Sequence, residues 1–148
     1  MQPIIHVAGG GLAGSEAAWQ IALAGLNVVL WEMRPVRMTP AHQTDRFAEL
    51  VCSNSLKSDQ HPSASWLLKE ELRRLGSFLI ATAYETRVPG GQALTVDREA
   101  FAERVTRAID SNRLIEARRE EFARIDSQAI TIIATGPLTS DTDRKSVV

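Results

Sequence analysis

The sequence predicts an α/β domain in which helices pack on the faces of a parallel sheet. Two apolar, β-branched segments at residues 4–8 and 28–32 flank a helix-forming segment at residues 13–24, which Gly25 is placed to end. This strand, helix, strand order is typical of a parallel sheet, because parallel neighbours need a crossover connection. A third apolar segment, residues 129–134, is expected to enter the same sheet.

The middle of the chain predicts an irregular segment followed by helices. Residues 33–62 are rich in proline and small polar side chains, which indicates a long irregular connection. A helix is expected over residues 63–76. Its apolar positions form one stripe that should face the core, made of Leu67, Leu68, Leu72 and Leu75. Residues 77–84 are also compatible with a helix.

The following residues predict one capped helix and several short strands. A turn at residues 90–91 precedes Asp97, which is expected to cap the start of a helix. The buried face of this helix should carry Phe101, Val105 and Ile109. Residues 114–117 and 122–125 are candidates for short strands.

Composition excludes several functional classes. The formal net charge is −1, with both signs mixed along the chain, so no broad cationic surface is expected to bind nucleic acid without specificity. One cysteine cannot form an internal disulfide, and no apolar window is long enough to span a membrane. The first residues lack the basic start of a signal peptide. We therefore expect a cytoplasmic protein without a membrane segment or a metal site.

The turn after the first strand contains the pattern G-x-G-x-x-G, formed by Gly9, Gly11 and Gly14. In dinucleotide-binding folds the first glycine permits a tight turn, the second lets backbone amides approach a diphosphate, and the third lets the helix pack closely on the sheet. The diphosphate then meets the positive end of the helix. The other predicted contacts in this turn are Gly10, Leu12 and Ala13.

The second strand ends in a carboxylate at the position that a ribose ligand requires. Glu32 follows Gly14 by 18 residues, close to the offset of ~20 at which a carboxylate binds ribose hydroxyls. A structural turn followed by a solvated glutamate is the alternative interpretation. The motif in this context favours a Rossmann-like dinucleotide-binding domain.

A second glycine-containing motif favours FAD over a nicotinamide cofactor. The strand at residues 129–134 runs into Thr135 and Gly136, and this ATG sequence resembles the motif at which a strand returns beside the first one in flavoproteins with two dinucleotide sites. The long excursion before the sheet resumes also resembles FAD proteins of the glutathione-reductase type. Thr135 and Gly136 are thus predicted to contact the cofactor.

Five longer segments together resemble the folate- and FAD-dependent tRNA (uracil-5-)-methyltransferases, the TrmFO-type enzymes. The segments are WEMRP at 31–35, TPAHQTDRFAELVCSNSLKSD at 39–59, LLKEELRRLGS at 67–77, VPGGQALTVDRE at 88–99 and IIATGPLTSD at 132–141. The resemblance covers residues 2–141. It implies methylation of the T-loop uracil of tRNA, with methylenetetrahydrofolate as carbon donor and FAD, reduced by NAD(P)H, as the source of reducing equivalents.

The resemblance also implies roles for individual residues. Cys52 corresponds to a catalytic thiol near the flavin, whereas the thiol taken as the uracil nucleophile belongs to a region beyond residue 148. Arg34 is expected on the adenosine side of the cofactor. The side chains expected to line the flavin pocket are His42, Ser53 and Asn54. Most tRNA contacts are expected outside this chain.

The same resemblance predicts that the FAD-binding domain is truncated. Residues 1–142 would be its N-terminal part, residues 143–148 a non-native tail, and the fragment alone would be inactive. Three alternatives stay open: an FAD-dependent enzyme that modifies wobble uridine, a generic flavoprotein oxidoreductase, and a non-catalytic dinucleotide-binding module. The loop sequence CSNSLKSD argues against the first, and the absence of a second nearby thiol argues against a redox pair.

Overall fold

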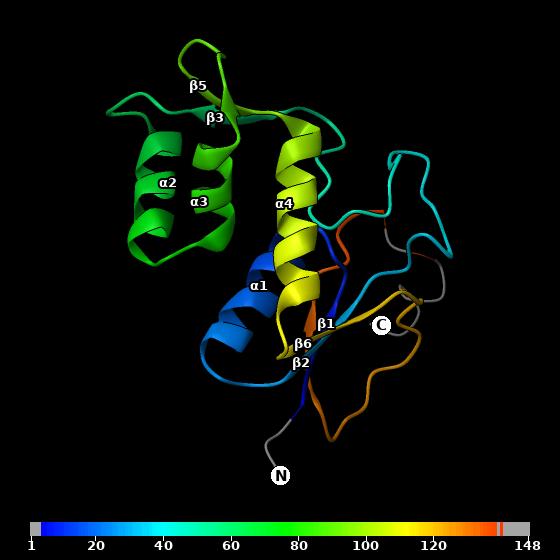
Figure 1. The fold of residues 1–148 in the computed structure, drawn as a ribbon. Coiled ribbons are helices and arrows are strands. Elements are labelled where there is room, and N and C mark those ends of the chain that lie inside the picture. Colours follow the sequence, from blue (N-terminus) through cyan, green and yellow to red (C-terminus); the bar gives the residue numbers. More distant parts are fainter. Residues whose placement is uncertain (1–3, 139, 141–148) are drawn as a thin grey trace.

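A parallel four-stranded sheet forms one half of the protein (Figure 1), in a computed structural model that describes residues 4–138 and 140. The strand order is β6-β2-β1-β7, and each neighbouring pair runs parallel. The strands are β1 (Ile5–Ala8), β2 (Val28–Trp31), β6 (Ile115–Arg118) and β7 (Ile130–Ile133). The predicted fold class and the pairing of the third apolar segment with the first strand are confirmed.

The prediction of a strand at residues 122–125 is wrong. This segment comes after β6 and forms a connection without strand pairing. The apolar residue at the start of this segment, Phe122, is buried for another reason. Its ring packs edge-on against Trp31, with ring centroids 5.4 Å apart, and its side chain is buried there. Phe122 is therefore buried by an aromatic contact above the end of β2.

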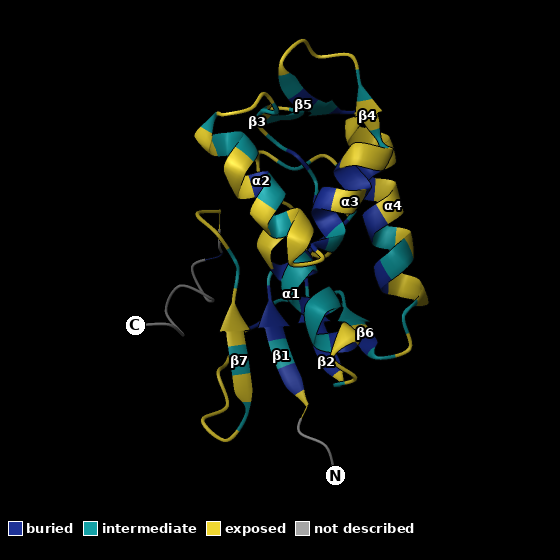
Figure 2. Ribbon diagram, turned by 90° about the vertical axis from the view of Figure 1, so that its left-hand side faces the viewer, coloured by how far each residue is buried: buried dark blue, intermediate teal, exposed yellow. Residues whose placement is uncertain are grey.

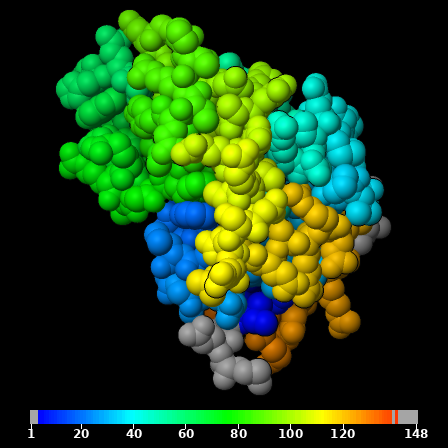
Figure 3. Space-filling model, in the orientation of Figure 1, coloured from blue at the N-terminus to red at the C-terminus, as the bar shows by residue number. Residues whose placement is uncertain are grey.

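Two helices cover one face of the sheet. α1 (Leu12–Leu23) packs on β1 and β2, and α4 (Arg98–Ser111) packs on β6. In Figure 3, α4 runs as a yellow ridge between the green segments and the orange ones. The core between these helices and the sheet includes Val7, Leu30, Ala18 and the predicted α4 residues Phe101, Val105 and Ile109. The buried face predicted for this helix is confirmed.

A smaller unit of two helices and an antiparallel sheet completes the described fold. β3 (Ser55–Ser58) and β4 (Arg87–Val88) pair on either side of β5 (Ala93–Val96). They accompany α2 (Ala64–Arg74) and α3 (Phe78–Glu85) (Figure 1). β3 lies inside the segment predicted to be irregular. Its strand pairing is interrupted by a register shift, and Lys57 has a φ of 67°, which explains why no strand pattern is visible in the sequence.

The core-facing stripe predicted for α2 is wrong for three of its four leucines, whereas the fourth, Leu72, is half-buried. Leu67, Leu68 and Leu75 are exposed, with 51%, 57% and 77% of their surface accessible. The one buried residue of α2 is instead Lys69. Its Nζ donates to three backbone carbonyls, those of Leu56 at 3.0 Å, Ser58 at 2.7 Å and Ser65 at 2.9 Å. α2 is thus attached through an ammonium group, and Figure 2 shows much of its surface exposed.

The small unit is joined to the main sheet through α1. The carboxylate of Glu16, in the middle of α1, accepts hydrogen bonds from the backbone N–H groups of Phe78 and Leu79 at 3.0 and 2.9 Å, so it caps the start of α3 from outside that helix. Trp19 stacks on Phe78 with ring centroids 4.2 Å apart. These contacts fix α3 on α1, and α3 in turn packs on α4.

Candidate functional site

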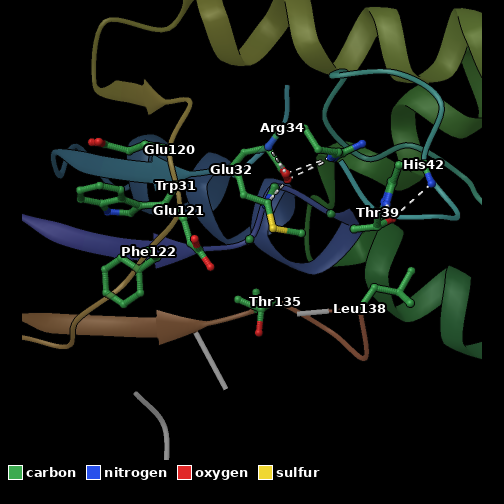
Figure 4. A pocket seen from close by; sticks show the side chains of 15 residues that line it. Trp31, Glu32, Arg34, Thr39, His42, Glu120, Glu121, Phe122, Thr135 and Leu138 are labelled. Atoms are coloured by element: carbon green, nitrogen blue, oxygen red, sulfur yellow. Dashed lines mark hydrogen bonds and ion pairs between the residues drawn. The ribbon is translucent and has the colours of Figure 1, made fainter. Parts of the chain in front are cut away.

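A pocket lies where the carboxyl ends of the four parallel strands meet (Figure 4). Ligands of open α/β sheets bind at this edge, because the loops that follow the strands converge there. The pocket is lined by residues that follow β1, β2, β6 and β7: Gly9, Gly10, Gly11, Trp31, Glu32, Met33, Arg34, Thr39, His42, Glu120, Glu121, Phe122, Ala134, Thr135 and Leu138. Three of the four connections were predicted to hold site residues; the one after β6 was not.

The three glycines of the G-x-G-x-x-G motif differ in whether the fold leaves space for a side chain at their positions. Gly9 has a φ of 100°, and a Cβ there would lie 2.6 Å from the carbonyl oxygen of Ala134. A Cβ on Gly14 would overlap the carbonyl oxygen of Gly9. A Cβ on Gly11, in contrast, would meet nothing within 4 Å, and its backbone has an ordinary φ of −72°. Gly9 and Gly14 are therefore required by the fold itself, whereas Gly11 leaves space at the start of α1.

The start of α1 is open to an anionic ligand. Ser63, Ser77 and Asp97 cap α2, α3 and α4 with side-chain oxygens. At α1, within the described residues, no side chain caps the helix and no acidic residue lies in the first turn. The first N–H groups of a helix need acceptors, and a phosphate group can provide them. Leu12 and Ala13, predicted to offer these groups, form this turn and are exposed.

Glu32 is the centre of a hydrogen-bond network at the end of β2. Its Oε2 accepts from the N–H of Gly10 at 3.0 Å, and both carboxylate oxygens accept from the guanidinium of Arg34 at 2.9 and 3.1 Å. The backbone N–H of Arg34 adds a fourth bond at 3.0 Å. Burial would raise the pKa of Glu32, but the hydrogen bonds and charge of Arg34 and the Gly10 N–H hold the pKa below its ordinary value of 4.5. The carboxylate is therefore ionised, and the four acceptor positions of its oxygens are all used.

Arg34 connects this carboxylate to the loop that follows. Its guanidinium is buried, and besides Glu32 it binds the carboxylate of Glu49 at 2.9 Å and the carbonyl of Thr44 at 3.0 Å. Its side chain lines the pocket while its donors are directed at protein groups (Figure 4). Contact with the adenosine side of a cofactor stays a prediction for Arg34.

His42 lies at the opposite end of the pocket from Trp31. Its Nδ1 is 2.6 Å from the hydroxyl oxygen of Thr39 (Figure 4). Partial burial and the neighbouring charge of Arg34 lower the pKa of His42 below 6.5, although Glu49 acts in the other direction. His42 is therefore mainly neutral near pH 7. It lines the pocket, and its contact with a flavin stays a prediction.

Sequence reasoning missed the aromatic end of the pocket. Trp31 is held there by a hydrogen bond from its Nε1 to Nδ1 of His6 at 3.1 Å and by the guanidinium of Arg118, whose central carbon lies 4.8 Å from the ring centroid. Phe122 packs against its edge. The rule that ligands lie beyond the carboxyl ends of parallel strands would have indicated Trp31, which ends β2, and the residues after β6.

The segment after β6 is attached to the loop after β2. Arg37 Nη1 lies 3.1 Å from Glu121 Oε1, and Arg119 Nη1 donates to the carbonyl of Asp45 at 2.5 Å. Arg119 also lies over the ring of Phe47, 3.8 Å from its centroid. Glu121 is further hydrogen-bonded by the hydroxyl of Ser140. These contacts close one side of the pocket.

Cys52, Ser53 and Asn54 do not line this pocket. Cys52 is exposed in the connection between β2 and β3. The side-chain amide of Asn54 donates to the carbonyl of Val96 at 3.0 Å, and the hydroxyl of Ser53 accepts from the N–H of Ser55 at 3.1 Å. Among the contacts of the described residues, neither side chain is hydrogen-bonded to the Cys52 thiol. Their role at the flavin stays a prediction.

The ATG segment is divided between the pocket and its rim. Thr135 lines the pocket directly after β7, and Gly136 follows it with a φ of 68°. Contact of these two residues with a cofactor stays a prediction. The non-native tail predicted at residues 143–148 lies outside the described residues.

In the part of the chain that the structure describes, no helix has the length and apolar character needed to cross a membrane. No group of three His, Cys, Asp or Glu side chains is placed to hold a metal ion in that same part.

Three curated proteins are similar in sequence to nearly all of this chain. A protein from Solibacter usitatus, named methylenetetrahydrofolate--tRNA-(uracil-5-)-methyltransferase TrmFO, is 62% identical over 140 residues, which are 95% of this chain and 32% of the relative. A protein of the same name from Koribacter versatilis is 62% identical over 138 residues, 93% of this chain and 31% of the relative. A third, from Streptococcus pneumoniae, is 56% identical over 140 residues, again 95% of this chain and 32% of the relative.

The chain therefore spans about a third of the length of these curated relatives. The family described as glucose inhibited division protein A matches residues 4–146, which is nearly all of the sequence. The chain belongs to the glucose inhibited division protein A family.

Proposed function

We propose that this chain is the N-terminal, FAD-binding part of an enzyme that methylates C5 of the T-loop uracil in tRNA. The carbon donor would be methylenetetrahydrofolate, and NAD(P)H would reduce the FAD. Support comes from three relatives of that name with 56–62% identity over nearly all of this chain. The family match alone does not distinguish this reaction from that of the wobble-uridine enzymes, so the proposal depends on these relatives.

The FAD-binding role rests on one observation in particular, the open space at Gly11 beside the uncapped start of α1. The N–H groups of Leu12 and Ala13 would receive the diphosphate, and the ribose would approach Glu32 from the pocket. Trp31 and Phe122 offer an apolar wall at one end of the pocket, where a flat ring can pack. Bound FAD and folate would supply the reducing equivalents and the one-carbon unit.

Cys52 is the proposed catalytic thiol of this part. It is exposed, so a substrate or a flavin held by the rest of the enzyme could reach it. A thiolate is the reactive form of cysteine, and reaction requires access. The second thiol that the resemblance implies, and most of the tRNA surface, would lie outside this chain. The 148-residue chain is accordingly expected to be inactive as a methyltransferase.

A glycine pair tests the FAD-binding role. Gly11→Ala places a methyl group in the space that the diphosphate would occupy, so the dissociation constant for FAD should rise about tenfold or more, with an unchanged melting temperature. Gly14→Ala is the matched comparison and should lower the melting temperature, because its Cβ overlaps the Gly9 carbonyl. FAD fluorescence quenching and thermal unfolding measure the two effects. Unchanged FAD affinity in folded Gly11→Ala would contradict the placement of the diphosphate.

A second experiment tests Cys52 in a full-length enzyme that contains this sequence. Cys52→Ala should keep bound FAD, seen by its absorbance, and should lose methyl transfer to T-loop uracil. Ser55→Ala is the control, because Ser55 is not a predicted site residue and its hydroxyl accepts a bond from the N–H of Lys57 in the same part of the chain. Near-normal turnover of Cys52→Ala would show that the thiol is not catalytic.

A further inference from the structure

We infer that Arg34 and Glu49 are positioning residues that couple occupancy of the nucleotide pocket to the segment that presents Cys52. This inference rests on the proposed function, because it concerns the nucleotide pocket and the thiol described there. Its basis is a continuous set of hydrogen bonds from the glycine turn to residues 43–50.

Gly10 joins the glycine turn directly to the segment before Cys52. Its N–H donates to Glu32, and its carbonyl accepts from the N–H of Ala48 at 2.9 Å. A Cβ on Gly10 would lie 2.5 Å from a ring carbon of Phe47 and 2.8 Å from Glu32 Oε2. A shift of the glycine turn relative to residues 47–48 would break these contacts.

Glu49 organises the loop on the other side of this junction. Its carboxylate accepts from the N–H groups of Gln43 at 2.9 Å and Thr44 at 3.2 Å, and from the Thr44 hydroxyl at 3.0 Å. The cation that it binds is Arg34, which also binds the Thr44 carbonyl. The buried guanidinium of Arg34 therefore connects Glu32 to Glu49 and to the backbone of Thr44.

The hydrogen bonds of Glu32 link ligand binding in the pocket to the position of Arg34. Its four hydrogen bonds include three from Arg34, so a ligand hydroxyl that donates to Glu32 must share or replace one of them. Ligand binding then changes the contacts of Arg34 and, through it, of Glu49. A ligand shifts a conformational equilibrium only through such a difference in contacts between two states.

Cys52 lies in a short segment of the chain that is held in place by contacts on both sides. On one side Ala48 and Leu50 are buried, and Ala48 has a φ of 53°, which alanine rarely adopts without support from its surroundings. On the other side Asn54 and Val96 exchange two hydrogen bonds, each 3.0 Å long. The accessibility of the thiol therefore depends on where residues 48–50 are held.

The test measures alkylation of Cys52 by iodoacetamide, with and without saturating ADP, in the 148-residue chain. ADP fills the adenosine and diphosphate positions but has no flavin ring that could shield the thiol directly. Since the chain has a single cysteine, the adduct is unambiguous. ADP should change the alkylation rate about threefold or more. Glu49→Gln should bind ADP with nearly wild-type affinity, measured by calorimetry, and should lose most of this response.

The control is Glu85→Gln, which removes an exposed ion pair with Arg104 and should respond to ADP like the wild type. If Glu49→Gln does not fold, Thr44→Val is judged by the same criterion; it removes the hydroxyl that donates to Glu49 and accepts from the N–H of Arg46. Bound ADP without a change in the wild-type alkylation rate, or a wild-type response in the Glu49 variant, overturns the inference. Failure of both ADP and FAD to bind overturns the proposed function instead.

Discussion

Helices α2 and α4 have the same kind of sequence and opposite environments. Both are amphipathic, and both begin with a side-chain cap, Ser63 in α2 and Asp97 in α4. The apolar stripe of α4 is buried between α3 and β6, whereas Leu67 and Leu68 of α2 are exposed. Figure 2 shows the contrast in burial between the two helices.

The difference teaches that periodicity predicts a helix and its apolar face, but not what covers that face. α4 is held by hydrophobic burial. α2 is held by its packing on α3 and β3 and by the Lys69 ammonium group, which replaces an apolar contact with three hydrogen bonds to carbonyls. Substitutions in the two helices should therefore affect stability in different ways.

The largest effect is expected in α4. Phe101→Ala removes a completely buried ring, and such truncations destabilise by about 3–5 kcal/mol because they lose apolar burial and leave a cavity. Urea unfolding followed by circular dichroism measures this loss. Leu68→Ala in α2 is the control and should change the free energy of unfolding little. Equal losses in the two variants would contradict the difference in burial.

Lys69→Met should have the next largest effect. It keeps the aliphatic stem but removes the Nζ donor from the carbonyls of Leu56 and Ser58 outside α2 and of Ser65 within it, and the free energy of unfolding should fall by roughly 2–3 kcal/mol. Lys57→Met is the matched control, because Lys57 is exposed on the neighbouring strand β3. If Met at position 69 were neutral or stabilising in the same unfolding experiment, apolar packing would be what α2 requires.

The two caps should contribute equally despite the unequal burial of their helices. Asp97 accepts from the N–H groups of Glu99 and Ala100, both at 3.0 Å, and Ser63 accepts from the N–H of Trp66 at 3.2 Å. Asp97→Ala and Ser63→Ala should each cost about 1 kcal/mol. Chemical denaturation of both variants checks this. A loss confined to Asp97→Ala would show that α2 is frayed at its start.

The smallest effect on stability is expected from the exposed face of α2. The double substitution of Leu68 and Leu75 by Gln should change the free energy of unfolding by less than about 0.5 kcal/mol, because both side chains are already exposed. It should reduce self-association, since exposed apolar patches promote contact between molecules. Sedimentation velocity at increasing concentration measures this. Strong destabilisation would mean that the leucines are buried in solution.

The sequence was sufficient for features that depend on neighbouring residues. The glycine turn, the cap at Asp97 and the strand that ends before Glu32 each follow from a local pattern, and the structure confirms them. β3, the capping of α3 by Glu16 and the burial of Lys69 could not be predicted. Each depends on partners brought together by the fold, such as β5 for β3 and the residue pair Phe78 and Leu79 for Glu16.

The candidate site divides in the same way. Residues directly after a strand could be placed, because parallel strands end at a common edge. The pairing of Arg34 with Glu49 and the position of Phe122 over Trp31 depend on how long connections fold back, and no local pattern reports that. The roles of Cys52, Ser53 and Asn54 came from the resemblance and were not visible in spacing.

The crowded position of Gly10 has a consequence for how this sequence can vary. The obstacle to a side chain at position 10 includes the ring of Phe47, so the tolerance of one position depends on the residue at the other. A library of double substitutions should recover folded Gly10→Ala chains mainly together with a smaller residue in place of Phe47. Positions 10 and 47 would then be inherited as a pair, although 36 residues lie between them in the chain.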